Sequence, residues 1–216
     1  MKISQGRKLL LLGAALVIVD QVIKVLVKTN MQPGESFNVI GNWFRILFIE
    51  NEGMAFGMKF GGQVGKFLLS LFRIGLFGVL CWWISSLSRK MYAEDGSRAM
   101  FSDGKSPLIP SGVLVGLTLI TAGALGNIID SLFYGIVFDY APFMFGKVVD
   151  MFYFPIIDSY WPQWMPVVGG EHFIFFSPVF NFADSCVTVG AFYLILFQNR
   201  FFTRSEAASK PSGEGK

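Results

Sequence analysis

Four apolar stretches, each of about 20 residues or more, constrain the fold of this chain more than any other feature. They cover about residues 9–28, 64–87, 108–129 and 179–198. An α-helix rises about 1.5 Å per residue, so each stretch can cross a hydrocarbon core about 30 Å thick. The composition agrees, since 53% of the 216 residues are hydrophobic and 15% are charged, more apolar than a soluble core requires. The sequence predicts a membrane all-α fold with four transmembrane helices.

The basic residues predict how these helices are oriented. Many of them precede the first stretch, separate the second from the third or follow the fourth: Lys2, Arg7, Lys8, Arg89, Lys90, Arg98, Lys105, Arg200, Arg204, Lys210 and Lys216. The contrast is imperfect, because Lys28, Arg45, Lys59 and Lys66 fall elsewhere. Cytoplasmic loops are enriched in Lys and Arg, so we expect both termini in the cytoplasm. The first stretch has no Ala-x-Ala-like cleavage site after it, which favours a retained helix over a signal peptide. The net charge of +3 forms no basic stripe, so no nucleic-acid partner is predicted.

The two loops expected on the outer side differ in composition. The first, about 30–63, contains two runs rich in β-branched and aromatic residues, 37–40 and 43–49, separated by Gly41-Asn42. This pattern predicts a small outer β-hairpin or sheet. The second, about 131–178, is so aromatic that we expect it in the membrane interface. Residues 1–204 are predicted to form a single membrane-embedded domain, and 205–216 a polar, flexible tail.

Acidic residues near membrane depth indicate a functional site, because burying a carboxylate is costly. Two similar units, 126–130 and 180–184, each place Asn and Asp three residues apart: Asn127 with Asp130, and Asn181 with Asp184. Helices of opposite direction would bring the two units to the same depth. Asp150 adds a third acid from the loop that joins them. Helix capping is the alternative reading and accounts for Asp184, but Asp130 falls at the helix end that disfavours negative charge.

Two further features are predicted near the same depth. Asp20 and Lys24 have i,i+4 spacing and could form an ion pair that lowers the cost of burying either. A lysine that snorkels to the interface with Asp20 as its partner is the alternative to a direct catalytic role. Residues 50–57 include Asn51 and Gly53, and could form an ordinary turn or hold an extended peptide.

Other chemistries have little support in the sequence. No group of His, Cys and carboxylate residues has metal-ligand spacing, so neither a metal nor another cofactor is predicted. The lone His172 is more typical of a structural role. Arg73 is assigned no function, and Ser131 has no lysine beside it that could act as its base.

Five motifs in one order resemble the lipoprotein signal peptidase family, also called signal peptidase II. They are Val19-Asp20-Gln21 with Lys24, Asn51-Glu52-Gly53-Met54-Ala55-Phe56, Gly126-Asn127-Ile128-Ile129-Asp130, Gly146-Lys147-Val148-Val149-Asp150 and Val179-Phe180-Asn181-Phe182-Ala183-Asp184-Ser185. The resemblance implies four membrane helices, an outer cradle of β-structure and a catalytic dyad of Asp150 and Asp184. The residues then expected to bind substrate or support the dyad are Asp20, Lys24, Asn51, Gly53, Gly126, Asn127, Asp130 and Asn181.

The chain departs from the family pattern at two places. Ser131 stands where the family usually has arginine, so the contact of that arginine is absent or replaced. The loop after it is expanded, and Asp139 could be aligned with the family's Val-Val-Asp aspartate in place of Asp150. We prefer Asp150 because Val-Val-Asp-Met fits the motif better, and Asp139 remains the rival.

The resemblance implies an aspartic endopeptidase without cofactors in the bacterial inner membrane, with its active site near the periplasmic face. Its substrate would be a diacylglyceryl-modified prolipoprotein, cleaved on the amino side of the lipidated Cys. Membrane lipids and globomycin-type inhibitors are the other partners implied. A small proton-coupled transporter is the alternative, although such proteins place their acids near the bilayer midplane.

Overall fold

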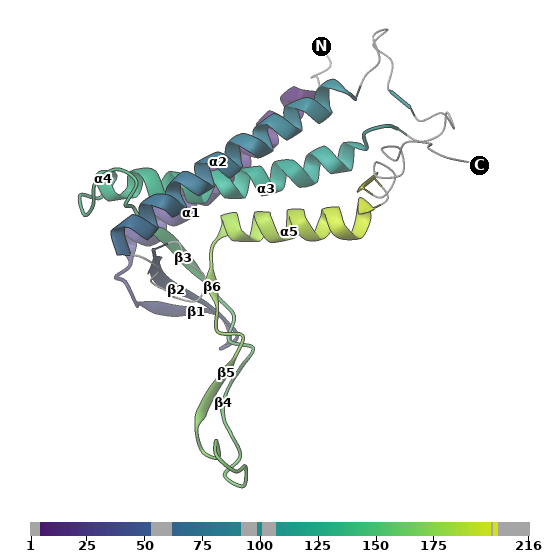
Figure 1. The fold of residues 1–216 in the computed structure, drawn as a ribbon. Coiled ribbons are helices and arrows are strands. Elements are labelled where there is room, and N and C mark those ends of the chain that lie inside the picture. Colours follow the sequence, from purple (N-terminus) through teal and green to yellow (C-terminus); the bar gives the residue numbers. More distant parts are fainter. Residues whose placement is uncertain (1–4, 53–61, 92–98, 101–106, 200, 203–216) are drawn as a thin grey trace.

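Four apolar helices form the bundle of the computed structural model, which describes residues 5–52, 62–91, 99–100, 107–199 and 201–202 (Figure 1). They are α1 (Gln5–Asn30), α2 (Gly62–Arg89), α3 (Ser111–Ile129) and α5 (Phe182–Phe197). The spans containing α1, α2 and α3 are long and apolar enough to cross a membrane. With 16 residues, α5 is shorter than expected and about 24 Å long, because residues 179–180 form a strand instead of its first turn.

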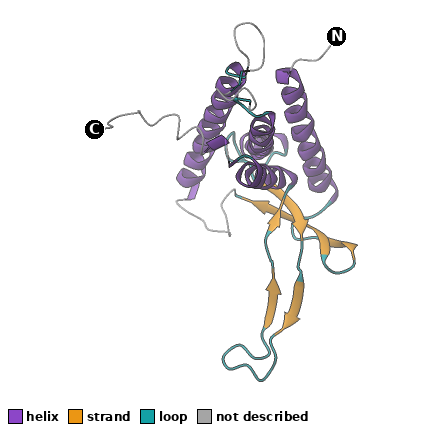
Figure 2. Cartoon of the chain, turned by 90° about the vertical axis from the view of Figure 1, so that its right-hand side faces the viewer, coloured by secondary structure: helices purple, strands orange, loops and turns teal. Residues whose placement is uncertain are grey.

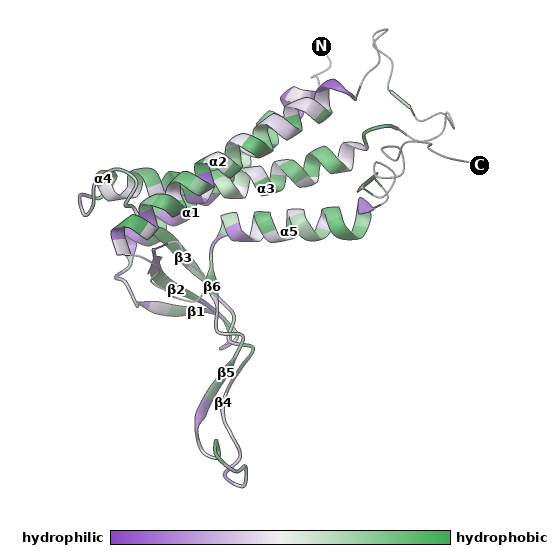
Figure 3. Cartoon of the chain, viewed as in Figure 1, coloured by the Kyte–Doolittle hydropathy of each residue, from purple (hydrophilic) through white to green (hydrophobic). Residues whose placement is uncertain are grey.

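Helix α3 lies at the centre of the bundle and packs against α1, α2 and α5. In the most apolar 18 residues of its span, 50% are buried, against 11% for α1 and 6% for α2. The outer helices therefore expose many Leu, Ile and Phe side chains. Figure 3 shows that hydrophobic residues run along much of their length. Helices with such exposed apolar faces are typical of a protein that uses lipid as its solvent.

Close packing of α3 and α5 depends on glycines that face the partner helix. A Cβ at Gly123 would lie 2.3 Å from the carbonyl oxygen of Ala183. A Cβ at Gly190 would likewise lie 2.8 Å from the carbonyl oxygen of Gly116. Small residues allow helix backbones to approach in this way. The contact sets the distance between the two Asn-x-x-Asp units.

A four-stranded antiparallel sheet lies at one end of the bundle, in the order β1-β2-β3-β6 (Figure 1). Its strands are β1 (Ser36–Ile40), β2 (Phe44–Asn51), β3 (Val148–Tyr153) and β6 (Val179–Phe180). The β1–β2 hairpin is the one predicted, and Gly41 in its turn has a φ of 52°. In the β2–β3 pairing Ile49 lies opposite Asp150 and Asn51 opposite Val148. Phe48, Val149 and Met151 are buried in the cluster that joins sheet and bundle.

The helical segment that contains α3 does not end at residue 129, as the sequence had predicted. It continues as a π-helical turn (Asp130–Tyr134) and the short helix α4 (Gly135–Val137) before returning to β3. The returning backbone lies directly on this turn, because Gly146 donates to the carbonyl oxygen of Ser131 at 2.9 Å. A Cβ at Gly146 would lie 2.1 Å from the carbonyl oxygen of Asp130, so only glycine fits. This contact places the start of β3 beside the end of α3.

The aromatic loop contains a second hairpin, β4 (Ile157–Tyr160) and β5 (His172–Phe175). It projects from the sheet across the direction of the helix axes and away from the bundle (Figures 1 and 2). The sequence analysis did not predict these strands, and the location of the loop in the membrane interface stays a prediction.

We expect Gly123→Ala to lower the melting temperature of the protein in detergent, because the new methyl group would collide with the α5 backbone. Overpacking of this kind costs about 1–3 kcal/mol. Gly75→Ala is the matched control, since a Cβ at Gly75 of α2 meets nothing within 4 Å. Equal melting temperatures for the two variants would contradict the close contact of α3 and α5.

Candidate active site

The two Asn-x-x-Asp units meet where the end of α3 lies beside the start of α5. Asn181 caps α5. Its side-chain oxygen accepts from the backbone N–H of Asp184 at 2.9 Å, and its backbone N–H donates to the Asp184 carboxylate. The capping interpretation is therefore correct for this pair. The same carboxylate also accepts from Asn127 Nδ2 of α3 at 2.7 Å, a contact that capping does not require.

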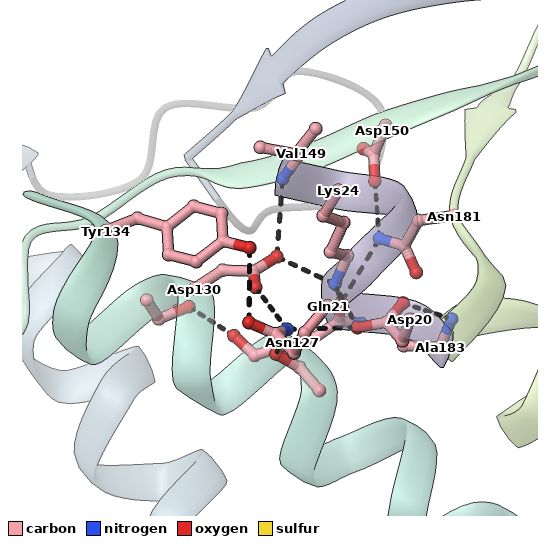
Figure 4. A network of polar contacts seen from close by, with 12 residues as sticks. Asp20, Gln21, Lys24, Asn127, Asp130, Tyr134, Val149, Asp150, Asn181 and Ala183 are labelled. Atoms are coloured by element: carbon pink, nitrogen blue, oxygen red, sulfur yellow. Dashed lines mark hydrogen bonds and ion pairs between the residues drawn. The ribbon is translucent and has the colours of Figure 1, made fainter. Parts of the chain in front are cut away.

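Lys24 of α1 lies fully buried at the centre of a polar network (Figure 4). Its ammonium group contacts Asp20 at 2.9 Å, Asp130 at 2.7 Å and Asn127 Oδ1 at 2.8 Å. These three acceptors match the three donors of an ammonium group. Lys24 is thus an internal counterion, and the snorkelling alternative is wrong for it.

Gln21 and Tyr134 extend this ion cluster, and neither was assigned a role from the sequence. Gln21 donates to Asp130 Oδ1 at 2.9 Å and accepts from the Tyr134 hydroxyl at 3.1 Å. Asp20 accepts from the backbone N–H of Ala183 at 2.9 Å, which ties α1 to the first turn of α5. Gly126 leaves room for this contact, because a Cβ there would lie 2.5 Å from Asp20 Oδ2.

Strand β3 supplies the third carboxylate, that of Asp150. This residue is 2% exposed. It accepts from Asn51 Nδ2 of β2 at 3.0 Å and from Asn181 Nδ2 at 2.7 Å. Asn181 Nδ2 also lies 3.1 Å from Asn127 Oδ1. Asp150 and Asp184 are therefore linked through two side-chain amides, those of Asn181 and Asn127.

The environment of Asp150 favours its protonated form. Burial, and after it the negative charge of Asp184, raise the pKa of Asp150 to about 7. Hydrogen bonds from Asn51 and Asn181 oppose this rise and do not cancel it. A carboxyl group that holds its proton near neutral pH can act as a general acid.

The rival acid lies in a different environment. Asp139 is exposed, has a φ of 52° and follows α4, and its backbone N–H donates to Ile136. The structure therefore joins Asp150, and not Asp139, to the amide-linked network in the described residues. Gly53, also predicted at the site, lies outside the described residues.

Arg73 of α2 reaches the same cluster, although no role was predicted for it from the sequence. Its guanidinium donates to Ser131 Oγ at 2.8 Å, and Ser131 donates to the carbonyl oxygen of Asn127 at 2.9 Å. Asp184, Asp130 and Asp150 all act on it electrostatically. A guanidinium from α2 thus contacts Ser131, the residue that departs from the family pattern. Such a role could not be found from local spacing, because 58 positions separate Arg73 from Ser131.

The chemistry available here is that of carboxylates, amides, the buried cation Lys24 and the half-buried cation Arg73. Among the described residues, no group of three or more His, Cys, Asp or Glu side chains could hold a metal ion. Two acids in unequal environments, linked by amide donors, are suited to acid–base chemistry on a polar bond.

Comparison with known proteins gives one consistent family. The family model described as signal peptidase (SPase) II matches residues 12–200. The lipoprotein signal peptidase of Porphyromonas gingivalis is 42% identical over 90% of this chain and 84% of its own length. That of Amoebophilus asiaticus is 33% identical over 83% of this chain and 72% of its own length.

Solved structures agree on the fold. One, described as a bacterial membrane enzyme determined by the in meso method, superposes with a TM-score of 0.54 at 25% identity, over 88% of this chain and 90% of its own. A second with the same description has a TM-score of 0.53 at 23% identity, over 97% and 94%.

We expect Asp150→Asn to remove a pH-dependent part of the free energy of unfolding. The pKa of Asp150 is raised from the usual value of about 3.9 to about 7, so the folded state binds this proton more tightly. The resulting stabilisation is complete below about pH 4 and is lost as pH rises through about 7. The melting temperature of the wild type minus that of the variant should therefore fall between about pH 4 and pH 8. A difference that stays constant over this range would contradict the raised pKa.

Proposed function

This chain belongs to the signal peptidase II family, and on that premise we propose that it removes signal peptides from prolipoproteins as an aspartic-type protease with Asp150 and Asp184 as its dyad. The assignment of the dyad rests on one observation: Asp150 and Asp184 are linked through the amides of Asn181 and Asn127, and Asp150 has a raised pKa. A proton-coupled transporter, the alternative considered from the sequence, is not supported by the relatives.

The two acids are proposed to have different roles at the start of the reaction. Asp184 lies in the first turn of α5 and accepts from Asn127, and we assign it the role of the base. Asp150 has a raised pKa and holds the shared proton. Asp184 would then take a proton from water as the water oxygen attacks the scissile carbonyl carbon. Asp150 donates its proton to the carbonyl oxygen, and a tetrahedral intermediate forms.

The tetrahedral intermediate collapses when a proton reaches the leaving nitrogen. The C–N bond breaks, the new carboxyl group leaves with the signal peptide, and the amine remains on the lipidated Cys. Because protons are exchanged within a coupled pair, the observed pKa values belong to the dyad as a whole.

Membrane placement is also part of the proposal. We place α1, α2, α3 and α5 across the inner membrane with both termini in the cytoplasm, as the basic residues indicate. The sheet and the dyad then lie at the periplasmic end. A diacylglyceryl-modified substrate could keep its acyl chains in the outer leaflet while its peptide reaches Asp150 and Asp184. Residues 1–204 are assigned to one domain, and the predicted tail 205–216 lies outside the described residues.

We expect Asp150→Asn and Asp184→Asn each to abolish cleavage of a lipidated precursor, because each removes a titrating member of the dyad. Asp139→Asn is the matched control and should retain most of the activity, since Asp139 lies outside the network. Gel-shift assays with purified, folded variants in lipid would measure this. An inactive Asp139→Asn beside an active Asp150→Asn would show that the dyad is assigned to the wrong loop residue.

Arg73 is proposed to position Ser131 and to hold positive charge near the three acids. We expect Arg73→Met to lower kcat about tenfold or more, with partial rescue by Arg73→Lys. Loss of a nearby cation disfavours ionised carboxylates, so the acid limb of the pH–rate profile should move to higher pH.

Arg89→Met is the matched control for this helix, because Arg89 is exposed and donates to the carbonyl oxygen of Ser85, four residues before it. A lower kcat for Arg73→Met with an unchanged pH profile would reduce Arg73 to a packing residue.

A further inference from the structure

The β4–β5 hairpin carries two faces of opposite character. Residues opposite each other in an antiparallel pair share a face. Ile157 pairs with Phe175 and Ser159 with Phe173, which makes one face largely apolar. Asp158 pairs with Ile174 and Tyr160 with His172, which makes the other face largely polar.

The polar face already has partners within the protein. Asp158 contacts His172 at 2.6 Å and Arg45 of β2 at 3.5 Å. The Tyr160 and His172 rings lie 5.1 Å apart. This face is therefore directed toward polar groups of the hairpin and the sheet.

The apolar face has no such cover from the described residues. Ile157 is 47% and Phe175 57% exposed. Phe173 is half-buried, and its ring stacks on that of Trp161 with the ring centroids 4.4 Å apart. An isolated two-stranded hairpin is marginally stable in water. A hairpin with an uncovered apolar face therefore needs an apolar surface to lie on.

The base of the hairpin holds it in a defined direction. Phe154, just before β4, stacks on Phe44 of β2 at 4.6 Å and on Phe180 of β6 at 5.7 Å. From this base the hairpin extends away from the bundle in both views, and in Figure 1 it runs across the direction of the helix axes (Figures 1 and 2). If the helices cross a bilayer, the hairpin runs along its surface.

We propose that β4–β5 is a membrane-surface arm that lies on the outer lipid–water interface with Ile157, Phe173 and Phe175 facing the lipid. The tip of the hairpin supports contact with lipid. Trp164 is 80% exposed there, and Trp is enriched where polar and apolar media meet. Residues 156–176 contain two acidic residues, Asp158 and Glu171, and no Lys or Arg. The arm therefore binds through its apolar and aromatic side chains, and anionic lipid does not attract it.

The arm goes beyond the proposed catalytic function, since it concerns how the protein rests on the membrane. It also differs from a lid over the dyad. The hairpin directs its length away from the helices that carry Asp184 and Asn127.

Spin labels on the two faces would test the arm in nanodiscs of phosphatidylcholine. In a background with Cys81 and Cys186 replaced by alanine, single variants Ile157→Cys, Phe175→Cys and Tyr160→Cys would carry the label. Val79→Cys on the exposed face of α2 is the lipid reference, and Asn38→Cys on β1 is the water reference. Cleavage activity of each labelled protein checks that it remains folded.

We expect labels at 157 and 175 to resemble the Val79 reference, with high access to oxygen and low access to a soluble nickel chelate. The label at 160 should have several-fold higher access to the nickel chelate. Adding phosphatidylglycerol or salt should leave these values unchanged. Nickel access at 157 and 175 equal to that at Asn38 would overturn the proposal. Protection of these positions from both reagents would also overturn it, because a second copy or another protein segment would then cover the face.

Discussion

The buried ammonium group of Lys24 is the interaction on which the rest of the site depends. It binds Asp20 from its own helix and Asp130 and Asn127 from α3, so it joins two helices at one point. Removing one partner of a buried ion pair typically costs about 3–5 kcal/mol, because the other charge is left without compensation. The spacing of α1 and α3 is therefore fixed at this depth.

Lys24 also sets the direction of the hydrogen bonds that reach the two proposed catalytic acids. Because Asn127 Oδ1 accepts from Lys24, its amide nitrogen must face Asp184. The N-cap acts in the same way on Asn181, whose oxygen accepts from the α5 backbone and whose nitrogen then faces Asp150. One cation and one helix terminus thus turn both amides so that each presents donors to a carboxylate. The cap of α5 is structural and at the same time orients the site.

The sequence predicted those features that depend on local composition. The length of the apolar stretches predicted the four helices. The two short runs on either side of Gly41 predicted the β1–β2 hairpin. It did not predict that residues 179–180 pair with β3, because this pairing depends on a strand about 27 positions away. Arg73 and Gln21 were missed for the same reason, since a single polar residue in an apolar helix does not reveal which distant group it contacts.

The choice between Asp139 and Asp150 depends on a physical difference that the motif alone does not express. Val149 and Met151 are fully buried on one face of β3, so strand alternation directs Asp150 to the opposite face. That face is covered as well, because the cap of α5 lies on it and Asn181 donates to the carboxylate. A strand buried on both faces is normally apolar throughout, so an acid within it has a cost that structure alone does not repay. Asp139 carries no such cost in its exposed turn, which is why burial favours Asp150 as the acid retained for chemistry.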